Sequence, residues 1–277
     1  MSTDHTHESE FISNLVKRTW VYQQRHGRDA VGLSHSGLKI KRIYRINNAS
    51  KRTIYEREKL MMMPVRKVPQ QLVEKAILTS ATLGDDMETG NASPKAEVAM
   101  SHSNTHASLS ANESSVVTLI DEIQQPTVHR QPKHLRTPSK PKQQALGKNE
   151  AYLFHGTKIE NIQDIIENGF DLNKSKAGLY GKAIYLAECS EKADQYTDTK
   201  LKRRKQCLTM FLVRTALGTI KHHEEEGPTR LPLRGALGVR SNGFDSVLAG
   251  SQKRFREFLV FDARQCYPEY LIVYDRV

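Results

Sequence analysis

The segment LFHGT at residues 153–157 is the first of three short stretches that share one pattern, a candidate functional side chain within a mostly apolar, strand-like run. The second stretch is GKAIYLA at residues 181–187, and the third is REFLVF at residues 256–261. A carboxylate between apolar strand residues is unusual unless it is paired or functional. The stretches present a histidine, a tyrosine and a glutamate in chain order, namely His155, Tyr185 and Glu257.

The residues around these stretches indicate a domain of short strands with few helices. TKIE at residues 157–160 is a capping box, and it predicts a helix whose buried stripe contains Ile159, Ile162, Ile165 and Ile166. Gly169 stands where a glycine at a helix C-terminus belongs. Further strands are expected at residues 208–213, 257–261 and 270–274. Because strands and helices do not alternate and no G-x-G-x-x-G turn opens a helix, the pattern favours an α+β domain over a Rossmann fold.

The composition is that of a basic chain of 277 residues, with a net charge of +11 and a pI near 9.5. This balance favours nucleic acid or phosphate-bearing ligands such as a dinucleotide, although a well-solvated surface produces the same excess. The three cysteines, at positions 189, 207 and 266, are widely spaced, which argues against a disulfide scaffold and a zinc site. The polar start has no apolar signal core, and no run approaches a membrane span. We therefore expect a nuclear or cytoplasmic protein that is neither secreted nor membrane-bound.

Composition divides the chain into segments. Residues 1–10 are expected to be a flexible N-terminus, and residues 11–63 to form a helix, a strand and a second helix. The first helix has an apolar side that contains Phe11, Ile12, Leu15, Val16 and Trp20. The strand is expected at residues 38–46, and capping side chains at residues 47–50 precede the second helix.

Residues 64–149 change in character, since Ser, Thr, Gln, His, Asn and Pro dominate them. Such a segment buries too little apolar surface to offset its ordering entropy, so we expect a disordered insert. Two apolar pieces within it, residues 72–83 and 116–123, are weak candidates for helices or partner-binding segments. Residues 150–277 carry dense strand and turn signals and form the predicted catalytic core.

The His-Tyr-Glu series, together with QCYPEYLI at residues 265–272, resembles the catalytic domain of poly(ADP-ribose) polymerases, which are ADP-ribosyltransferases of the diphtheria-toxin-like type. The resemblance covers residues 151–277, and residues 30–60 faintly resemble the first strand and helix of the same core. It implies an α+β fold with two packed, mostly antiparallel sheets and flanking helices. It also implies that residues 11–63 belong to the transferase core and that residues 64–149 interrupt it.

The resemblance implies a reaction in which NAD+ is the substrate. The bond between nicotinamide and ribose is cleaved, nicotinamide is released, and ADP-ribose passes to a protein acceptor, which can be the enzyme itself. Because cleavage builds positive charge on the ribose C1′, the site must hold the carboxamide, grip the ribose hydroxyls and place a carboxylate near the cation. This chemistry needs no metal.

Each site residue takes a role from the resemblance. His155 would donate a hydrogen bond to the adenosine-side ribose, and the backbone of Gly156 would pair with the nicotinamide carboxamide, which glycine lets approach closely. Tyr185 and Tyr196 would hold the nicotinamide ring between aromatic faces. Glu257 would bind the 2′-hydroxyl of the nicotinamide ribose, stabilise the cation and help to deprotonate the acceptor.

Two neighbouring residues, and the identity of Glu257 itself, qualify these roles. Lys192 matches a family lysine beside the site, whereas Ala193 stands where the family has a serine that bonds the carboxamide, so this hydrogen bond is missing. Glu257 permits the extension of poly(ADP-ribose) chains without establishing it. The alternative for Glu257 is a structural ion pair with Arg254 or Arg256 at a strand edge.

Two other classes of function compete with the transferase. The first is a binding module that recognises NAD+ or a partner without turnover, and Ala193 is the feature that favours it. The second is a nucleic-acid-binding protein that uses residues 39–52 and the basic run at 200–205. The run HHEEE at residues 222–226 lacks metal-ligand spacing and is expected to be an exposed loop. The sequence gives no indication of the oligomeric state.

Overall fold

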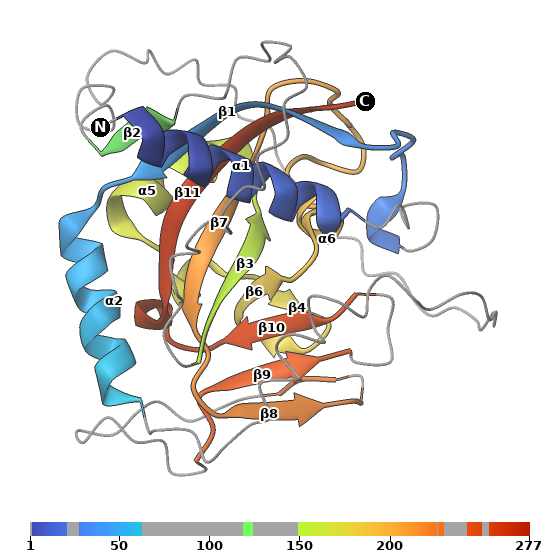
Figure 1. Cartoon of the computed structure of the whole chain (residues 1–277). Helices are drawn as coiled ribbons and strands as arrows, with labels where there is room; N and C mark the ends of the chain where they lie inside the picture. The colour runs from blue at the N-terminus through green and yellow to red at the C-terminus, as the bar shows by residue number, and fades with distance from the viewer. Residues whose placement is uncertain are drawn as a thin grey trace, which may run out of the picture.

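A computed structural model describes residues 2–20, 28–62, 119–123, 149–225, 227–229, 243–250 and 255–277. Its main feature is a nine-stranded sheet with the strand order β2-β1-β11-β7-β3-β6-β10-β9-β8 (Figure 1). All pairs of neighbouring strands are antiparallel except β8 and β9, which are parallel. The predicted α+β class with mostly antiparallel strands is therefore confirmed.

The first half of the sheet contains five strands: β1 (Leu38–Ile46), β2 (Ile120–Ile123), β3 (Glu150–Gly156), β7 (Leu208–Ala216) and β11 (Cys266–Arg276). The bounds of β1 are those expected from the alternation of apolar and basic residues. β2 pairs with the edge of β1, so part of the predicted insert joins the sheet. Residues 120–123 are therefore a strand and not the helix that was weakly expected at residues 116–123, because they pair with the edge of β1. Partner binding by this piece stays a prediction. The other apolar piece, residues 72–83, and most of the insert lie outside the described residues.

The second half contains β6 (Ile184–Ala187), β8 (Ile220–His223), β9 (Ser246–Ala249) and β10 (Glu257–Val260). A single residue pair, Phe154 with Ala187, joins it to the first half through β3 and β6. In Figure 1, β8, β9 and β10 run across the direction of β3, β7 and β11. The two expected sheets are thus two halves of one sheet. The run at residues 222–226, expected to be a loop, begins inside β8.

A separate two-stranded hairpin, β4 (Ala177–Gly178) and β5 (Gly181–Lys182), immediately precedes β6. The remaining short elements are single 3-10 turns: η1 (Arg28–Ala30), η3 (Ile159–Asn161), η4 (Leu172–Lys174) and η5 (Ala263–Gln265).

The two N-terminal helices have the buried face and the cap that the sequence predicts, but the first helix starts earlier than expected. α1 (Ser2–Arg18) buries Ile12 and Val16, as its apolar periodicity predicts. It starts at Ser2, so the expectation of a flexible segment at residues 1–10 was wrong for most of its length. Helix α2 (Ala49–Met61) begins at the expected cap, where the Asn48 side chain accepts a hydrogen bond from the Lys51 backbone at 3.1 Å.

The helix that follows β3 starts later than the capping box predicted. Residues 159–161 form the 3-10 turn η3, and α5 (Ile162–Asn168) begins only after it. Thr157 caps no backbone N–H of this helix, since its hydroxyl accepts a hydrogen bond from the Asn161 side chain at 2.9 Å instead. Ile159 is consequently 55 % exposed, while Ile162, Ile165 and Ile166 are buried as expected. Gly169 ends the helix with a φ of 73°, as expected of a C-terminal glycine.

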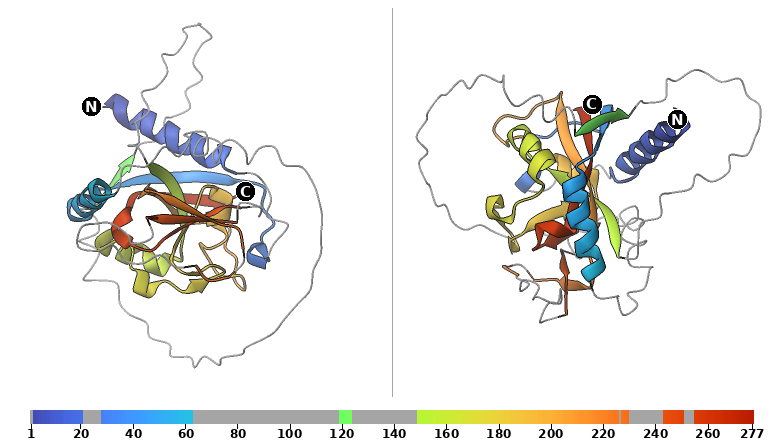
Figure 2. Two further views of the ribbon diagram at one scale, coloured as in Figure 1. Left: turned by 90° about the horizontal axis from the view of Figure 1, so that it is seen from below. Right: turned by 90° about the vertical axis from the view of Figure 1, so that its left-hand side faces the viewer.

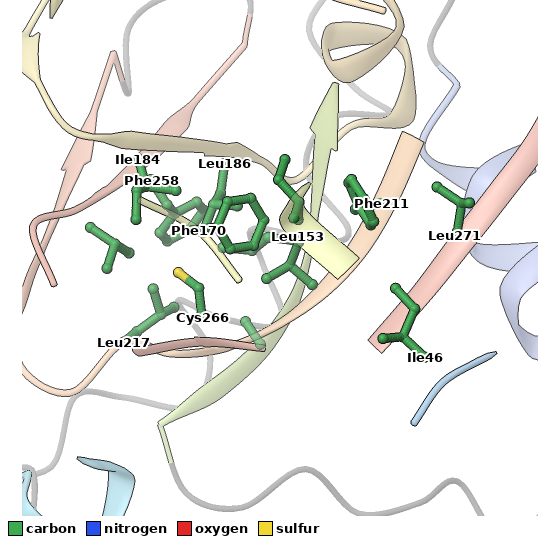
Figure 3. Close-up of a cluster of buried hydrophobic side chains, with 14 of the residues drawn as sticks. Ile46, Leu153, Phe170, Ile184, Leu186, Phe211, Leu217, Phe258, Cys266 and Leu271 are labelled. Atoms are coloured by element: carbon green, nitrogen blue, oxygen red, sulfur yellow. The ribbon is translucent and has the colours of Figure 1, made fainter. Parts of the chain in front are cut away.

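The core lies between the two halves of the sheet and continues under α5. Leu153 and Phe211 from the first half and Leu186 and Phe258 from the second half belong to one apolar cluster (Figure 3). Alternate residues of β7 and β11 point to the opposite face, where α1 and the short helix α6 (Ser190–Asp194) cover them. Figure 2 shows α1 and α5 on opposite faces of the sheet. The central strands are apolar on both faces because both faces are covered.

Candidate active site

The three motif stretches meet where the two halves of the sheet join. Strands β3, β6 and β10 are neighbours, and Ala187 of β6 pairs with Phe154 on one side and with Glu257 on the other. The Nδ1 atom of His155 lies 2.9 Å from the carbonyl oxygen of Tyr185. Residues more than a hundred positions apart in the chain are therefore brought to one edge of the junction.

His155 is held in one tautomer by this carbonyl. A carbonyl oxygen only accepts, so Nδ1 carries the proton and donates it. Burial lowers the pKa of His155 below its usual value, which keeps the ring neutral and leaves Nε2 as an acceptor. The ring also packs edge-on against Phe170, with centroids 5.0 Å apart. The expected role as a hydrogen-bond donor to the ribose therefore changes, because this geometry leaves Nε2 to accept a hydrogen bond from a hydroxyl.

Tyr185 connects β6 to the hairpin in front of it. Its hydroxyl donates to the carbonyl of Gly181 at 2.7 Å and accepts from the backbone N–H of Tyr180 at 3.0 Å. Burial raises the pKa of Tyr185 to about 12, so the phenol stays protonated. The tip of the ring also touches Gly178, where a Cβ atom would lie 2.7 Å from the hydroxyl. Tyr185 therefore positions the β4–β5 hairpin as well as lining the junction.

Gly156 is a glycine because of a close approach between two parts of the backbone. A Cβ atom at this position would lie 1.7 Å from the carbonyl oxygen of Ala193 and 2.6 Å from its carbonyl carbon. The end of β3 thus packs directly on α6. The sequence suggested that glycine serves an approach to the ligand, and the structure adds this contact as a reason of its own. The Ala193 side chain is buried in the apolar cluster beneath α1.

Glu257 opens β10 as a mostly buried carboxylate. Its side chain is 16 % exposed, and Lys192 of α6 places its Nζ 3.6 Å from Oε1. Burial raises the pKa of Glu257, an effect that the Lys192 ammonium opposes and the carboxylate of Asp29 reinforces. A carboxylate with a raised pKa is a better proton acceptor than an ordinary glutamate.

Arg256, one of the two alternative partners that the sequence offered for Glu257, pairs with a different carboxylate. Arg256 binds Glu188 through two hydrogen bonds of 2.9 and 2.8 Å, so its guanidinium is paired with a carboxylate other than that of Glu257. Arg254 lies outside the described residues. The ion pair of Glu257 is therefore with the lysine that the sequence had placed beside the site.

Tyr196 lies just beyond α6 and is 40 % exposed. Its hydroxyl accepts a hydrogen bond from Lys192 at 2.9 Å and donates one to Asp29 at 2.7 Å. The Lys192 ammonium also lies 5.0 Å from the centroid of the Tyr196 ring. An exposed aromatic face beside the catalytic candidates is suited to a planar ligand.

Asp29 is a site residue that the sequence analysis missed. It lies in η1 and forms ion pairs with Lys192 at 3.5 Å and with Lys200 at 2.8 Å. Burial disfavours its charge, but hydrogen bonds from Lys200 and Tyr196 and the charge of Lys192 together hold the pKa of Asp29 well below its usual value. No local sequence pattern around Asp29 predicts these contacts, because its partners are more than 160 positions away.

A buried network of ion pairs and hydrogen bonds around Asp194 holds α6 in place. Asp194 is fully buried and binds the guanidinium of Arg276 at 3.0 Å, and His35 lies 3.2 Å from the same carboxylate. The hydroxyl of Tyr274 donates to Asp194 as well. The last strand of the chain therefore fixes the helix that carries Lys192.

The basic run at residues 200–205 is partly used inside the protein. Lys200 binds Asp29, and Arg203 binds Asp198 at 2.6 Å together with the carbonyl oxygens of Asp29 and Val31. Lys202, Arg204 and Lys205 are exposed. The surface charge that this run offers to a polyanion is therefore smaller than its sequence indicated.

Metal-binding clusters and membrane-spanning helices are both absent from the described part of the chain. Within these residues no three His, Cys, Asp or Glu side chains lie together so as to hold a metal ion. Across the same ranges, no helix has both the length and the apolar character needed to span a bilayer.

The sequence of this chain is also similar to those of known proteins. The chain is similar to mouse protein mono-ADP-ribosyltransferase PARP12, with 32 % identity over 131 residues that cover 46 % of this chain and 17 % of the relative. It is similar to human protein mono-ADP-ribosyltransferase PARP11, with 28 % identity over 142 residues that cover 45 % of this chain and 41 % of the relative. Caenorhabditis elegans poly [ADP-ribose] polymerase tankyrase is 34 % identical over 77 residues, or 26 % of this chain and 3 % of the relative. The chain thus matches less than half the length of each of these relatives.

The family model described as the poly(ADP-ribose) polymerase catalytic domain matches residues 95–247. This range contains His155, Tyr185, Lys192 and Tyr196, and it ends before Glu257, which pairs with Ala187 of β6 in the structure. It also begins within the segment that the sequence had set apart as an insert. Because the match spans more than half of the chain, the chain belongs to the poly(ADP-ribose) polymerase catalytic domain family.

Proposed function

We propose that this protein cleaves NAD+ at the bond between nicotinamide and ribose and transfers ADP-ribose to protein acceptors, itself included. The observation that carries the proposal is the meeting of His155, Tyr185 and Glu257 on three neighbouring strands, with the carboxylate mostly buried and held by Lys192. Membership of the family and the names of the similar transferases support it.

The reaction balances without any group beyond NAD+ and the acceptor. The C1′–N bond breaks, and its electron pair stays on the nicotinamide nitrogen, which becomes neutral. The ribose C1′ becomes an oxocarbenium-like cation, and a nucleophilic atom of the acceptor then forms a new bond to C1′ and loses its proton. A carboxylate beside C1′ stabilises the cation, and this stabilisation is stronger in a water-poor site.

Glu257 takes this carboxylate role. Its raised pKa makes it a good acceptor for the 2′-hydroxyl of the nicotinamide ribose and for the proton that the acceptor releases. His155, neutral and with Nε2 free of the Tyr185 carbonyl, accepts a hydrogen bond from a hydroxyl of the adenosine-side ribose. Both groups bind a hydroxyl by accepting a hydrogen bond from it, which orients the sugars without adding positive charge near C1′.

The nicotinamide ring lies between Tyr185 and Tyr196, and the backbone of Gly156 pairs with its carboxamide. Ala193 supplies no hydroxyl for the carboxamide, so nicotinamide is held by one hydrogen bond fewer than in relatives with a serine at this position. A missing hydrogen bond of this kind weakens binding by about 0.5–1.5 kcal/mol. We therefore expect weaker inhibition by nicotinamide, and no loss of the bond-breaking step itself.

Glu257 also permits chain extension, because the same carboxylate can activate a hydroxyl of an ADP-ribose unit that is already attached. Two of the similar proteins are named mono-ADP-ribosyltransferases and one is named a poly [ADP-ribose] polymerase. Transfer of single units is the core of the proposal, and polymer formation is the extension that the intact carboxylate allows.

The test uses the purified chain and NAD+ labelled in its adenylate phosphate, followed by a denaturing gel. We expect a labelled protein band that is absent in Glu257→Gln and in His155→Ala, while a high-molecular-weight smear would indicate polymer. Glu122→Gln, an exposed carboxylate on the opposite edge of the sheet, is the matched control and should label normally. A wild-type chain that neither takes up label nor releases nicotinamide would contradict the proposal and favour the reading as a binding module.

A further inference from the structure

Asp29 reaches the site from a part of the chain that carries no motif. It lies in η1, which follows α1 in the chain and sits beside α6 (Figure 1). Its backbone is fixed independently of its side chain, since Arg203 donates to the carbonyl of Asp29 at 2.7 Å and to that of Val31 at 3.0 Å. The turn η1, held by Arg203, therefore places the Asp29 carboxylate beside α6.

The ammonium of Lys192 stands between two carboxylates. It lies 3.6 Å from Oε1 of Glu257 and 3.5 Å from Oδ2 of Asp29, and its short hydrogen bond, at 2.9 Å, is to the Tyr196 hydroxyl. The same hydroxyl donates to Asp29 at 2.7 Å. Lys192 is therefore shared and gives neither carboxylate its full attraction.

This sharing matters for Glu257, because a tightly paired lysine would occupy the oxygens that the ribose hydroxyl has to reach. A close ammonium also lowers the basicity of a carboxylate, and a second negative charge nearby raises it. Asp29 raises the basicity of Glu257 in two ways. Its own negative charge lies nearby, and it draws the Lys192 ammonium toward itself.

The geometry points to Asp29 as a positioning residue for the transferase reaction, one that holds Lys192 and Tyr196 in place and so weakens the ion pair between Lys192 and Glu257. The inference rests on the proposed function, and it deepens it by giving the N-terminal segment a part in the chemistry. Asp29 itself need not touch the substrate.

In the described part of the chain, the groups around Glu257 come from several elements. Lys192 comes from α6, Asp29 from η1, and Tyr185 from β6, where its phenol stays protonated. Arg256, the neighbour of Glu257 in the chain, is bound to Glu188, and Lys200 faces Asp29. Asp29 is thus the carboxylate whose charge raises the pKa of Glu257, and Asp29→Asn removes this charge while it keeps the backbone carbonyl that Arg203 binds.

The test is a carbon-13 NMR titration of the glutamate carboxylates, with the Glu257 signal assigned by its loss in Glu257→Gln. Asp29→Asn keeps the size of the side chain and an oxygen acceptor while it removes the charge. Because both carboxylates lie within 3.6 Å of one nitrogen, the removal should lower the pKa of Glu257 by at least about 0.5, even after solvent screening. The acid limb of kcat/KM should move to lower pH by the same amount.

Two variants complete the test. Asp29→Glu restores the charge and should return the pKa of Glu257 toward its wild-type value, and Glu122→Gln changes net charge equally at a remote edge and should leave it unmoved. An unmoved Glu257 pKa in Asp29→Asn, an equal shift in Glu122→Gln, or a loss of folded protein in Asp29→Asn would each overturn the inference. The titration needs no turnover. A wild-type chain that cleaves no NAD+ refutes the proposed function, whereas an unmoved pKa refutes only the role of Asp29.

Discussion

Replacing Gly156 by alanine tests how closely β3 must pack on α6. The new Cβ would lie 1.7 Å from the Ala193 carbonyl oxygen and 2.6 Å from its carbonyl carbon, far inside van der Waals contact. Both obstructing atoms are backbone, so no side chain can rotate away, and either β3 or α6 has to shift. Insertion of carbon into a packed region costs about 1–3 kcal/mol, and we expect Gly156→Ala near the upper end. A cost of about 3 kcal/mol lowers the thermal midpoint of a domain of this size by roughly 6–12 °C.

The assay is thermal unfolding followed by circular dichroism, with Gly37→Ala as the matched control. A Cβ atom at Gly37 would meet only a methyl group of Val277, at an ordinary 3.7 Å. Gly37→Ala should therefore leave the midpoint unchanged. Adding Ala193→Gly to Gly156→Ala should give no rescue, because the clash is with the backbone of Ala193. Equal midpoints for Gly156→Ala and Gly37→Ala, or a rescue by Ala193→Gly, would refute the packing argument.

Three further predictions concern the groups around this contact. Glu257→Gln should abolish transfer without lowering the thermal midpoint at pH 8. The pKa of Glu257 is raised in the folded state, so its negative charge opposes folding at any pH above its unfolded pKa. A lower midpoint for Glu257→Gln would contradict this sign. Tyr185→Phe leaves the Tyr180 N–H without its acceptor and should cost about 1–3 kcal/mol in urea unfolding, with a rise in KM for NAD+; an unchanged denaturation midpoint would contradict the hydrogen-bond assignment. Arg276→Met leaves the fully buried Asp194 without its main cation and should cost about 3–5 kcal/mol, and combination with Asp194→Asn should recover part of this loss; equal instability of the single and double variants would contradict the pairing.

The strands could be predicted from the sequence because their signals are local. Alternation of apolar and basic residues gave β1 its observed bounds, and the expected strand at residues 208–213 lies inside β7. Asn48 caps α2 as its side chain and position indicated. The three motif stretches overlap β3, β6 and β10, and these strands are neighbours in the sheet, so the stretches that the sequence singled out lie side by side.

Where the prediction failed, tertiary contacts had decided the local structure. Thr157 and Glu160 have the spacing of a capping box, but Asn161 takes the Thr157 hydroxyl and the helix starts later, which leaves Ile159 exposed. Likewise β2 forms because β1 offers it an edge, a fact that no four-residue pattern contains.

The ion pairs of the site could not be predicted from the sequence either. Sequence proximity suggested Arg256 as a structural partner for Glu257, but the fold gives Arg256 to Glu188 and gives Lys192 to Glu257. Asp29 arrives 163 positions before the lysine that it binds. Ion pairs between distant residues depend on how the chain returns on itself, so they become visible only in the structure.

The central claim is that His155, Tyr185 and Glu257 form a site that breaks the nicotinamide–ribose bond. The most direct measurement is the rate of nicotinamide release from NAD+, resolved by chromatography, for the wild-type chain and for Glu257→Gln at matched folded concentration. We predict release by the wild type, in step with the ADP-ribose attached to protein, and none above background by Glu257→Gln. Equal rates in the two proteins, or no release by a folded wild type that binds NAD+, would contradict the account.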